Sequence, residues 1–162
     1  MSQTAEDIIR GEWDLLKQTG LLTQIGGSAG PQKCKGIYNM FKWNALMFGP
    51  KNSPYNGYMF KFEIEFPTDY PNSAPRVFCR TPIYHMNINT DGKVCVASIT
   101  NNNEWKKAGN ISAVLLSIFM ILNRPNPGSP YRDDIATLYK ENREEYNRKV
   151  KEHCAQNAIP IS

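Results

Sequence analysis

The stretch FKFEIEF, residues 60–66, places four apolar side chains in strict alternation with three charged ones. Successive side chains of a β-strand point to opposite faces, so this period of two predicts a strand with one buried and one exposed face. The stretch FKWNALM, residues 41–47, has the same period. Between them, GPKNSPYNG, residues 49–57, is rich in the glycine, proline and asparagine typical of turns. The two stretches are therefore expected to pair as an antiparallel hairpin.

The flanking segments place strands in one block and helices in another. A short third strand is predicted at Val77–Arg80, and the glycine-rich residues 25–36 are expected to form a turn between strands. Apolar residues recur at helical spacing over Ala5–Lys17, which predicts an N-terminal amphipathic helix. The run Ile111–Leu122 predicts a central buried helix, which proline ends at Pro125, and two C-terminal helices follow. This order predicts an α+β fold with an antiparallel meander sheet.

Length and charge limit the expected partners. A chain of 162 residues can bury a core without metal or disulfide support, so one domain, residues 1–162, is expected. The net charge of +4 is shared evenly by the two halves of the sequence, without a one-sided basic stripe. Nucleic acid is therefore not an expected partner. A membrane is not expected either, because no secretory signal or run of about 20 apolar residues is visible.

Cysteine usage points to a reducing compartment. The four cysteines include no CxxC pair, and with only two histidines in the chain a zinc site is not expected. Free thiols of this kind are typical of proteins in the cytoplasm or nucleus, which is the expected localisation.

Residues 81–110 lack clear periodicity and hold an unusual set of polar side chains. Cys95, His85 and Asn87 combine a thiol, an imidazole and a carboxamide within eleven residues. Such a set favours covalent thiol chemistry, with sulfur as nucleophile and an amide hydrogen placed where negative charge develops on oxygen. Each residue also has a structural interpretation from the sequence alone. Cys95 suits a core position between two valines, His85 a buried hydrogen-bonded site, and Asn87 a turn.

Several motifs occur together and in order between about Phe41 and Val150. They are Tyr55–Gly57, Phe66–Pro75, Tyr84–Asn89, Gly92–Cys95, Trp105 and Pro125–Pro127. With them the chain resembles the ubiquitin-conjugating enzyme family. The resemblance implies four helices and a four-stranded antiparallel sheet, whose remaining strand is expected within Leu21–Ile25.

The resemblance also implies a function and a site. A carrier of this family accepts ubiquitin, or a similar modifier, from an activating enzyme as a thioester, here on Cys95, and transfers it to a substrate lysine or a ligase cysteine. Asn87 is implied to donate to the oxyanion or to organise the nearby loop, and His85 to be a structural hydrogen-bonding residue rather than a general base. No cofactor is implied, because the activating enzyme consumes the ATP. The implied partners are the modifier, the activating enzyme, a ubiquitin ligase and a protein substrate.

Departures from the family pattern are informative. Met86 stands where proline usually separates the signature histidine and asparagine, which is expected to loosen that turn. Ala97 and Ser129 stand where the family often has aspartates that orient and deprotonate an attacking lysine. Their absence predicts slower transfer to lysine than to cysteine, because an amine of pKa about 10.4 is protonated at neutral pH. Ser129 is either a plain loop residue or, before Pro130, a phosphorylation site that restores negative charge.

The surface that would face a ligase is also unusual. The proline-rich turn contains Asn72 and Ala74, and the segment after Trp105 contains Lys107. At the position of Asn72, the family commonly has an aromatic residue. Since hydrophobic anchors dominate small interfaces, either the ligase partners differ or these residues are solvated loop tips.

Three alternatives to a ubiquitin carrier remain at this point. A SUMO carrier is favoured by the ten-residue step from Cys95 to Trp105, although residues 101–104 lack that carrier's more acidic loop. A non-catalytic ubiquitin-binding relative would lack the cysteine that this chain retains. A thiol redox sensor would be expected to have a resolving cysteine near Cys95 in sequence.

Overall fold

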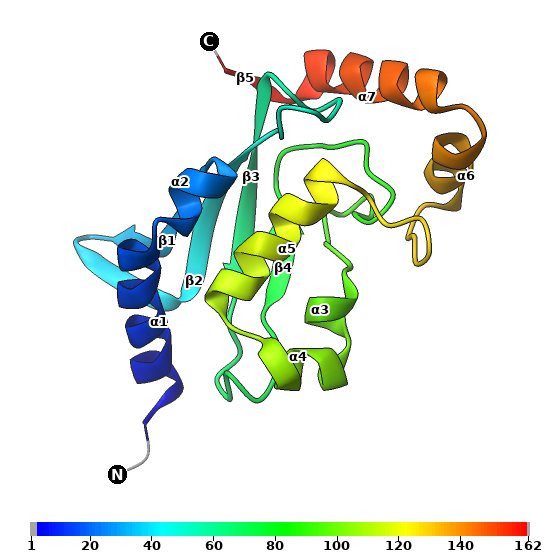
Figure 1. The fold of residues 1–162 in the computed structure, drawn as a ribbon. Coiled ribbons are helices and arrows are strands. Elements are labelled where there is room, and N and C mark those ends of the chain that lie inside the picture. Colours follow the sequence, from blue (N-terminus) through cyan, green and yellow to red (C-terminus); the bar gives the residue numbers. More distant parts are fainter. Residues whose placement is uncertain (1–2, 162) are drawn as a thin grey trace.

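Residues 3–161 are described by a computed structural model, in which the predicted hairpin forms the centre of an antiparallel sheet (Figure 1). Strand β2 spans Ile37–Phe48 and β3 spans Tyr58–Glu65. Ala45 pairs with Phe62, and the alternating apolar residues of both strands are buried against the core, as the period of two predicted. Strand β4, Arg76–Cys79, pairs with β3 close to the expected position. A two-residue strand, β5, Ile159–Pro160, also pairs with β3.

The prediction for the first strand was wrong in position. Leu21–Ile25 forms a short helix, α2, instead of the fourth strand, and the expected turn at 25–36 is largely strand β1, Gly27–Cys34. Strand β1 lies at the sheet edge and pairs with β2 along its length, apart from a register shift after Pro31. Strand β1 was not predicted because it is rich in small residues and shows no alternation of large buried side chains. Backbone pairing with β2 holds this strand in place. At Gly27 a β-carbon would lie 2.7 Å from the carbonyl oxygen of Leu46, so only glycine allows this approach.

The predicted helices are confirmed, and they cover one face and both ends of the sheet. Helix α5, Ile111–Asn123, lies across the sheet, with α1, Ala5–Thr19, at one end (Figure 1). Helices α6, Asp133–Glu141, and α7, Arg143–Asn157, lie at the other end. Within residues 3–161, no helix has the length and apolar character needed to cross a membrane.

Two short helices occupy part of the segment that lacked periodicity. They are α3, Ala97–Thr100, and α4, Asn102–Ala108. Asn101 caps α4 by accepting hydrogen bonds from the backbone N–H groups of residues 103 and 104. Trp105 is buried, and its Nε1 donates to the Pro71 carbonyl at 2.7 Å. Capping and one anchored side chain therefore stabilise a helix too short to show a period.

A single carboxylate joins three distant parts of the fold. The Tyr70 hydroxyl and the Ile111 backbone N–H both donate to Glu12 Oε1 at 2.7 Å. Tyr70 and Ile111 are buried, and the Ile111 N–H belongs to the first turn of α5, where no helical partner exists. Glu12 thus fixes α1 to the proline-rich turn and to the start of the central helix.

Candidate active site

His85 is a buried, neutral residue that supports the backbone around it. Its Nε2 lies 2.8 Å from the Ile121 carbonyl oxygen, and its Nδ1 accepts a hydrogen bond from the Asn87 backbone N–H at 3.0 Å. These partners assign the proton to Nε2, which donates to Ile121. Burial lowers the pKa of His85 to about 4. With both ring nitrogens engaged and the ring uncharged at neutral pH, His85 fixes the turn that carries Asn87.

The Asn87 carboxamide binds the loop that follows α5. Its Oδ1 accepts from the Asn126 N–H at 2.9 Å, and its Nδ2 donates to the Asn126 carbonyl at 2.9 Å and to the Ser129 carbonyl at 3.5 Å. The side chain is buried, with 1% exposure. One amide therefore holds the 126–129 loop against the 85–87 turn.

Met86, the residue in place of proline, takes part in the same arrangement. Its side chain is fully buried, and its carbonyl accepts hydrogen bonds from the backbone N–H groups of Tyr131 at 2.8 Å and Arg132 at 3.2 Å. The looser turn expected from the loss of proline stays a prediction. These contacts fasten the end of the 126–132 segment, as Asn87 fastens its beginning.

Cys95 lies beside this network with its thiol partly exposed. Its backbone N–H donates to the Asn87 carbonyl at 2.9 Å, which places the two residues on adjacent segments. The sulfur lies 4.0 Å from Thr100 Oγ1. The Tyr131 phenol lies near the same sulfur, and partial burial together with the neighbouring Cys95 thiol raises the pKa of Tyr131 to about 12. The Cys95 thiol is thus bordered by two hydroxyl groups.

The other cysteines have different environments. Cys79 and Cys154 are buried, and burial raises the pKa of each thiol to about 12. Cys34 is exposed near the end of β1. Of these cysteines, Cys95 alone combines an accessible thiol with a polar network, which suits a nucleophile better than the core position considered from sequence.

Ala97 and Ser129 are both exposed at the edges of the site. Ala97 begins α3, two residues after Cys95. Ser129 lies in the loop that Asn87 binds. The Asn87 carboxamide contacts the Ser129 backbone carbonyl and leaves the Ser129 hydroxyl outside that contact. The structure therefore brings the loop of Ser129 to the segment that precedes Cys95.

The residues considered for ligase contact lie in two joined surface segments. Asn72 is exposed and Ala74 half-buried in the proline-rich turn, while Lys107 is exposed on α4. The hydrogen bond from Trp105 to Pro71 fastens these segments to each other. They can thus contribute to one surface.

Sequence reasoning missed three residues of the site. Asn126 lay within a recognised proline motif, but nothing in the sequence indicated that its backbone pairs with Asn87. Tyr131 and Thr100, whose hydroxyls border the thiol, carried no signal either, because they lie 36 and five residues after Cys95 in irregular sequence.

Comparison with known proteins agrees with the geometry. A family model described as "Ubiquitin-conjugating enzyme" matches residues 17–154. The chain is 40% identical over 120 residues to a protein of Arabidopsis thaliana described as "Probable ubiquitin-conjugating enzyme E2 31", covering 74% of this chain and 77% of that protein. It is 39% identical over 116 residues to "Probable ubiquitin-conjugating enzyme E2 L460" of Acanthamoeba polyphaga mimivirus, covering 72% and 73% of the two chains.

Proposed function

This chain belongs to the ubiquitin-conjugating enzyme family, and we propose that it carries ubiquitin as a thioester on Cys95. The observation that carries the proposal is the partly exposed Cys95 thiol beside the buried His85 and Asn87. The family implies transferase chemistry and interaction with ubiquitin, an activating enzyme and a ligase.

The loading step is an exchange between two thioesters. The Cys95 thiolate attacks the carbonyl carbon that joins the modifier's C-terminus to the activating enzyme's cysteine. A new carbon–sulfur bond forms at Cys95, the old one breaks, and the activating enzyme's thiolate leaves. No cofactor is needed on this chain, because the thioester already stores the energy of the ATP that the activating enzyme has consumed in forming it.

His85 and Asn87 act by positioning in this proposal. The imidazole is neutral at pH 7 and engaged at both nitrogens, which supports a structural role and argues against a general base. The Asn87 carboxamide is engaged with the backbone of residues 126 and 129. This favours the loop-organising role over that of a free oxyanion donor.

The acceptor side lacks a carboxylate at the two positions where the family often has one. A lysine ammonium approaching Cys95 past Ala97 and Ser129 meets no acidic side chain at either position. Because the protonated amine is not a nucleophile, transfer to a ligase cysteine should be faster than direct transfer to lysine. Asn72, Ala74 and Lys107 are proposed to contribute to ligase contact.

A single-turnover loading experiment tests the proposal. The chain is incubated with activating enzyme, ATP and either ubiquitin or SUMO, and the product is resolved with and without reducing agent. We expect a ubiquitin adduct that is cleaved by reducing agent and absent in Cys95→Ala, while Cys34→Ala serves as the matched control that loads normally. A chase with free cysteine should discharge the adduct faster than free lysine, and Ser129→Asp should speed the lysine reaction.

Each alternative gives a different result. Loading with SUMO in place of ubiquitin would identify the other modifier, and no adduct with either would favour a non-catalytic binding role. A thiol that changes only on treatment with an oxidant would indicate a redox sensor.

A further inference from the structure

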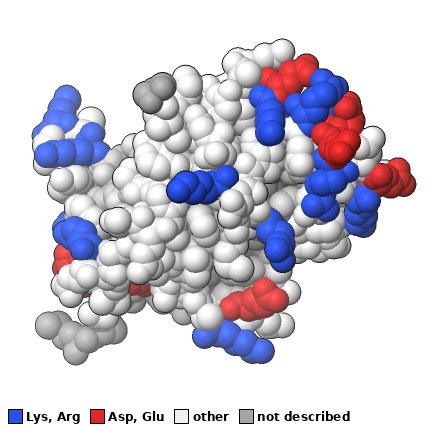
Figure 2. Space-filling view, turned by 45° about the horizontal axis from the view of Figure 1, so that its top comes forward, with Lys and Arg blue, Asp and Glu red and all other residues white. Residues whose placement is uncertain are grey.

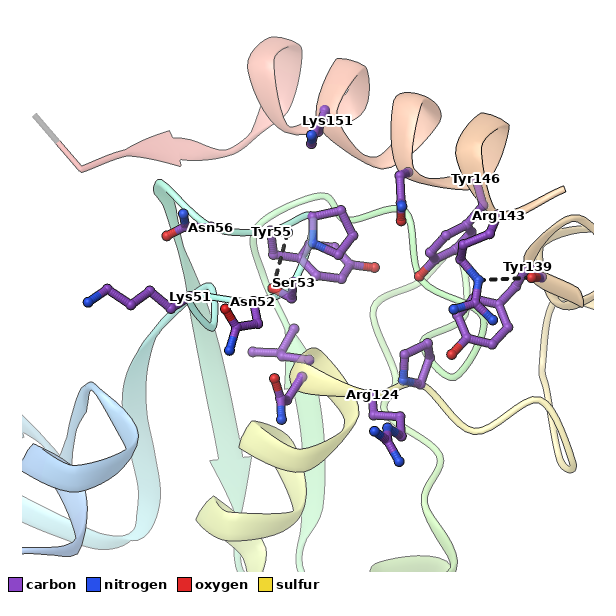
Figure 3. Close-up of a pocket in the computed structure, with 15 residues that line it drawn as sticks. Lys51, Asn52, Ser53, Tyr55, Asn56, Arg124, Tyr139, Arg143, Tyr146 and Lys151 are labelled. Carbon is purple, nitrogen blue, oxygen red and sulfur yellow. Dashed lines mark hydrogen bonds between the residues drawn. The ribbon is translucent and has the colours of Figure 1, made fainter.

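A second concave site lies away from the Cys95 thiol, under helix α7 (Figure 3). Its volume is about 720 Å³, within the range of ligand sites in proteins. Three segments form it: the β2–β3 connection, the end of α5, and helices α6 and α7. We call it the basic groove, after the cations that line it: Lys51, Arg124, Arg143 and Lys151.

The cations of the basic groove have no ion-pair partner in the part of the chain that the structure describes. The residues that line it include no aspartate or glutamate, and none of its four cations forms an ion pair within residues 3–161. By contrast, Arg148 on the same helix pairs with both Glu145 and Glu152. In Figure 2, basic and acidic side chains intermingle at one end of the face shown, whereas other Lys and Arg side chains lie apart from any acidic group. Unpaired cations around a hollow favour an anionic ligand.

Arg143 is held in an orientation that suits a carboxylate. Its guanidinium carbon lies 3.4 Å from the centroid of the Tyr139 ring, and its Nε donates to the Tyr139 carbonyl at 3.0 Å, which is the dashed line beside Arg143 in Figure 3. Stacking and one hydrogen bond fix the plane of the group and leave its terminal nitrogens available. A planar fork of this kind binds a carboxylate through two parallel hydrogen bonds.

The cations are too widely spread for one compact anion. Arg143 and Lys151 stand eight residues apart on α7, which corresponds to about 12 Å along the helix axis. In an extended peptide, side chains on one face repeat about every 7 Å. Three carboxylates at alternate positions therefore span two such repeats, which is close to the separation of Arg143 and Lys151 along the helix. The groove also presents side-chain amides that can donate to and accept from peptide groups: Asn52, Asn56, Asn123 and Asn147.

We propose that the basic groove binds an extended acidic segment of a protein substrate. Arg124 stands two residues before Asn126, whose backbone is bound by Asn87, so a segment in the groove runs next to the loop beside Cys95. Nucleic acid is the less suitable ligand, because the sequence spreads its basic excess evenly over both halves instead of concentrating it in one stretch. The substrate assignment rests on the proposed carrier function, whereas binding of the acidic segment does not.

Fluorescence anisotropy with a labelled (Ser-Glu)4 peptide tests the binding. The probe places carboxylates at alternate positions, and labelled (Ser-Gln)4 is its neutral counterpart. The double variant Arg124→Ala/Lys151→Ala should weaken binding about tenfold, as expected for two lost ion pairs. The matched control Lys106→Ala/Lys107→Ala removes the same charge from α4 and should change binding less than twofold. Arg143→Lys keeps the charge but lacks the fork, and it should weaken binding several-fold.

Three results would overturn the proposal. Equal losses in the two double variants would show attraction to net charge alone, and equal binding of the two peptides would exclude recognition of carboxylates. Tighter binding of a single-stranded oligonucleotide with the same sensitivity to Arg124→Ala/Lys151→Ala would assign the groove to nucleic acid.

The binding assay is independent of thioester formation, so the two proposals fail separately. Normal loading of Cys95 without peptide binding would reject the groove and leave the carrier function intact. Peptide binding without loading of Cys95 would reject the carrier function and leave the basic groove as a binding site. If both succeed, a lysine added to the acidic peptide should accept the modifier faster than a lysine on the neutral peptide, and Arg124→Ala/Lys151→Ala should remove the difference.

Discussion

Replacing Asn87 with alanine tests whether its carboxamide organises the loop after α5. The substitution removes the two 2.9 Å hydrogen bonds to the Asn126 backbone and the longer one to residue 129. At about 1 kcal/mol net for each of the two short bonds, the free energy of unfolding should fall by about 2 kcal/mol. For a chain of this size, that loss corresponds to a decrease of about 4–8 °C in Tm.

Urea unfolding measures the loss, and hydrogen exchange locates it. The Asn126 amide should exchange faster in Asn87→Ala, because its acceptor is gone. Asn72→Ala is the matched control, since it makes the same chemical change at an exposed position and should stay within about 0.5 kcal/mol of the unaltered protein. A thioester that forms normally but discharges slowly, with stability and Asn126 exchange unchanged, would refute the organising role and favour an oxyanion donor.

Three further predictions concern stability and reactivity. Glu12→Ala removes the acceptor of two buried donors and should lower the free energy of unfolding in urea by about 2–3 kcal/mol. Glu12→Gln keeps one acceptor oxygen and should lower it less, and equal losses in the two variants would contradict the shared contact. Tyr131→Phe removes the hydroxyl group near the Cys95 thiol, so the rate at which iodoacetamide alkylates that thiol should change about threefold. An unchanged rate would show that the Tyr131 hydroxyl does not act on Cys95. The pKa of His85 is about 4 in the folded chain and about 6.5 when unfolded, so the free energy of unfolding should fall by about 1.4 kcal/mol per pH unit as pH decreases between these values. His85→Gln should reduce this pH dependence more than His153→Gln, and equal reductions would refute the assignment of the slope to His85.

The sequence predicted the parts of the fold in which burial is periodic. Residues 60–65 lie on a strand whose alternate side chains enter the core, and the α5 run buries apolar residues at helical spacing. Strand β1 and helix α2 were misplaced, because Gly27 and its neighbours depend on pairing with β2 rather than on a buried face of their own.

The candidate site was predictable only where its residues are close in sequence. His85, Asn87 and Cys95 fall within eleven residues, and their chemistry drew attention to them. Asn126 and Tyr131 reach the site through the folding of α5 across the sheet, and they take part through a backbone group and a single hydroxyl. No local pattern encodes such contacts.

The bond between Asn87 and Asn126 has a consequence for sequence variation. The Asn87 side chain recognises one N–H and one C=O of a peptide backbone, much as a neighbouring strand would. Recognition of this kind does not depend on which side chains the loop carries. The exposed side chain of Ser129 is therefore free to diverge without releasing the loop, and new acceptor preferences can arise there while the architecture that presents them stays the same.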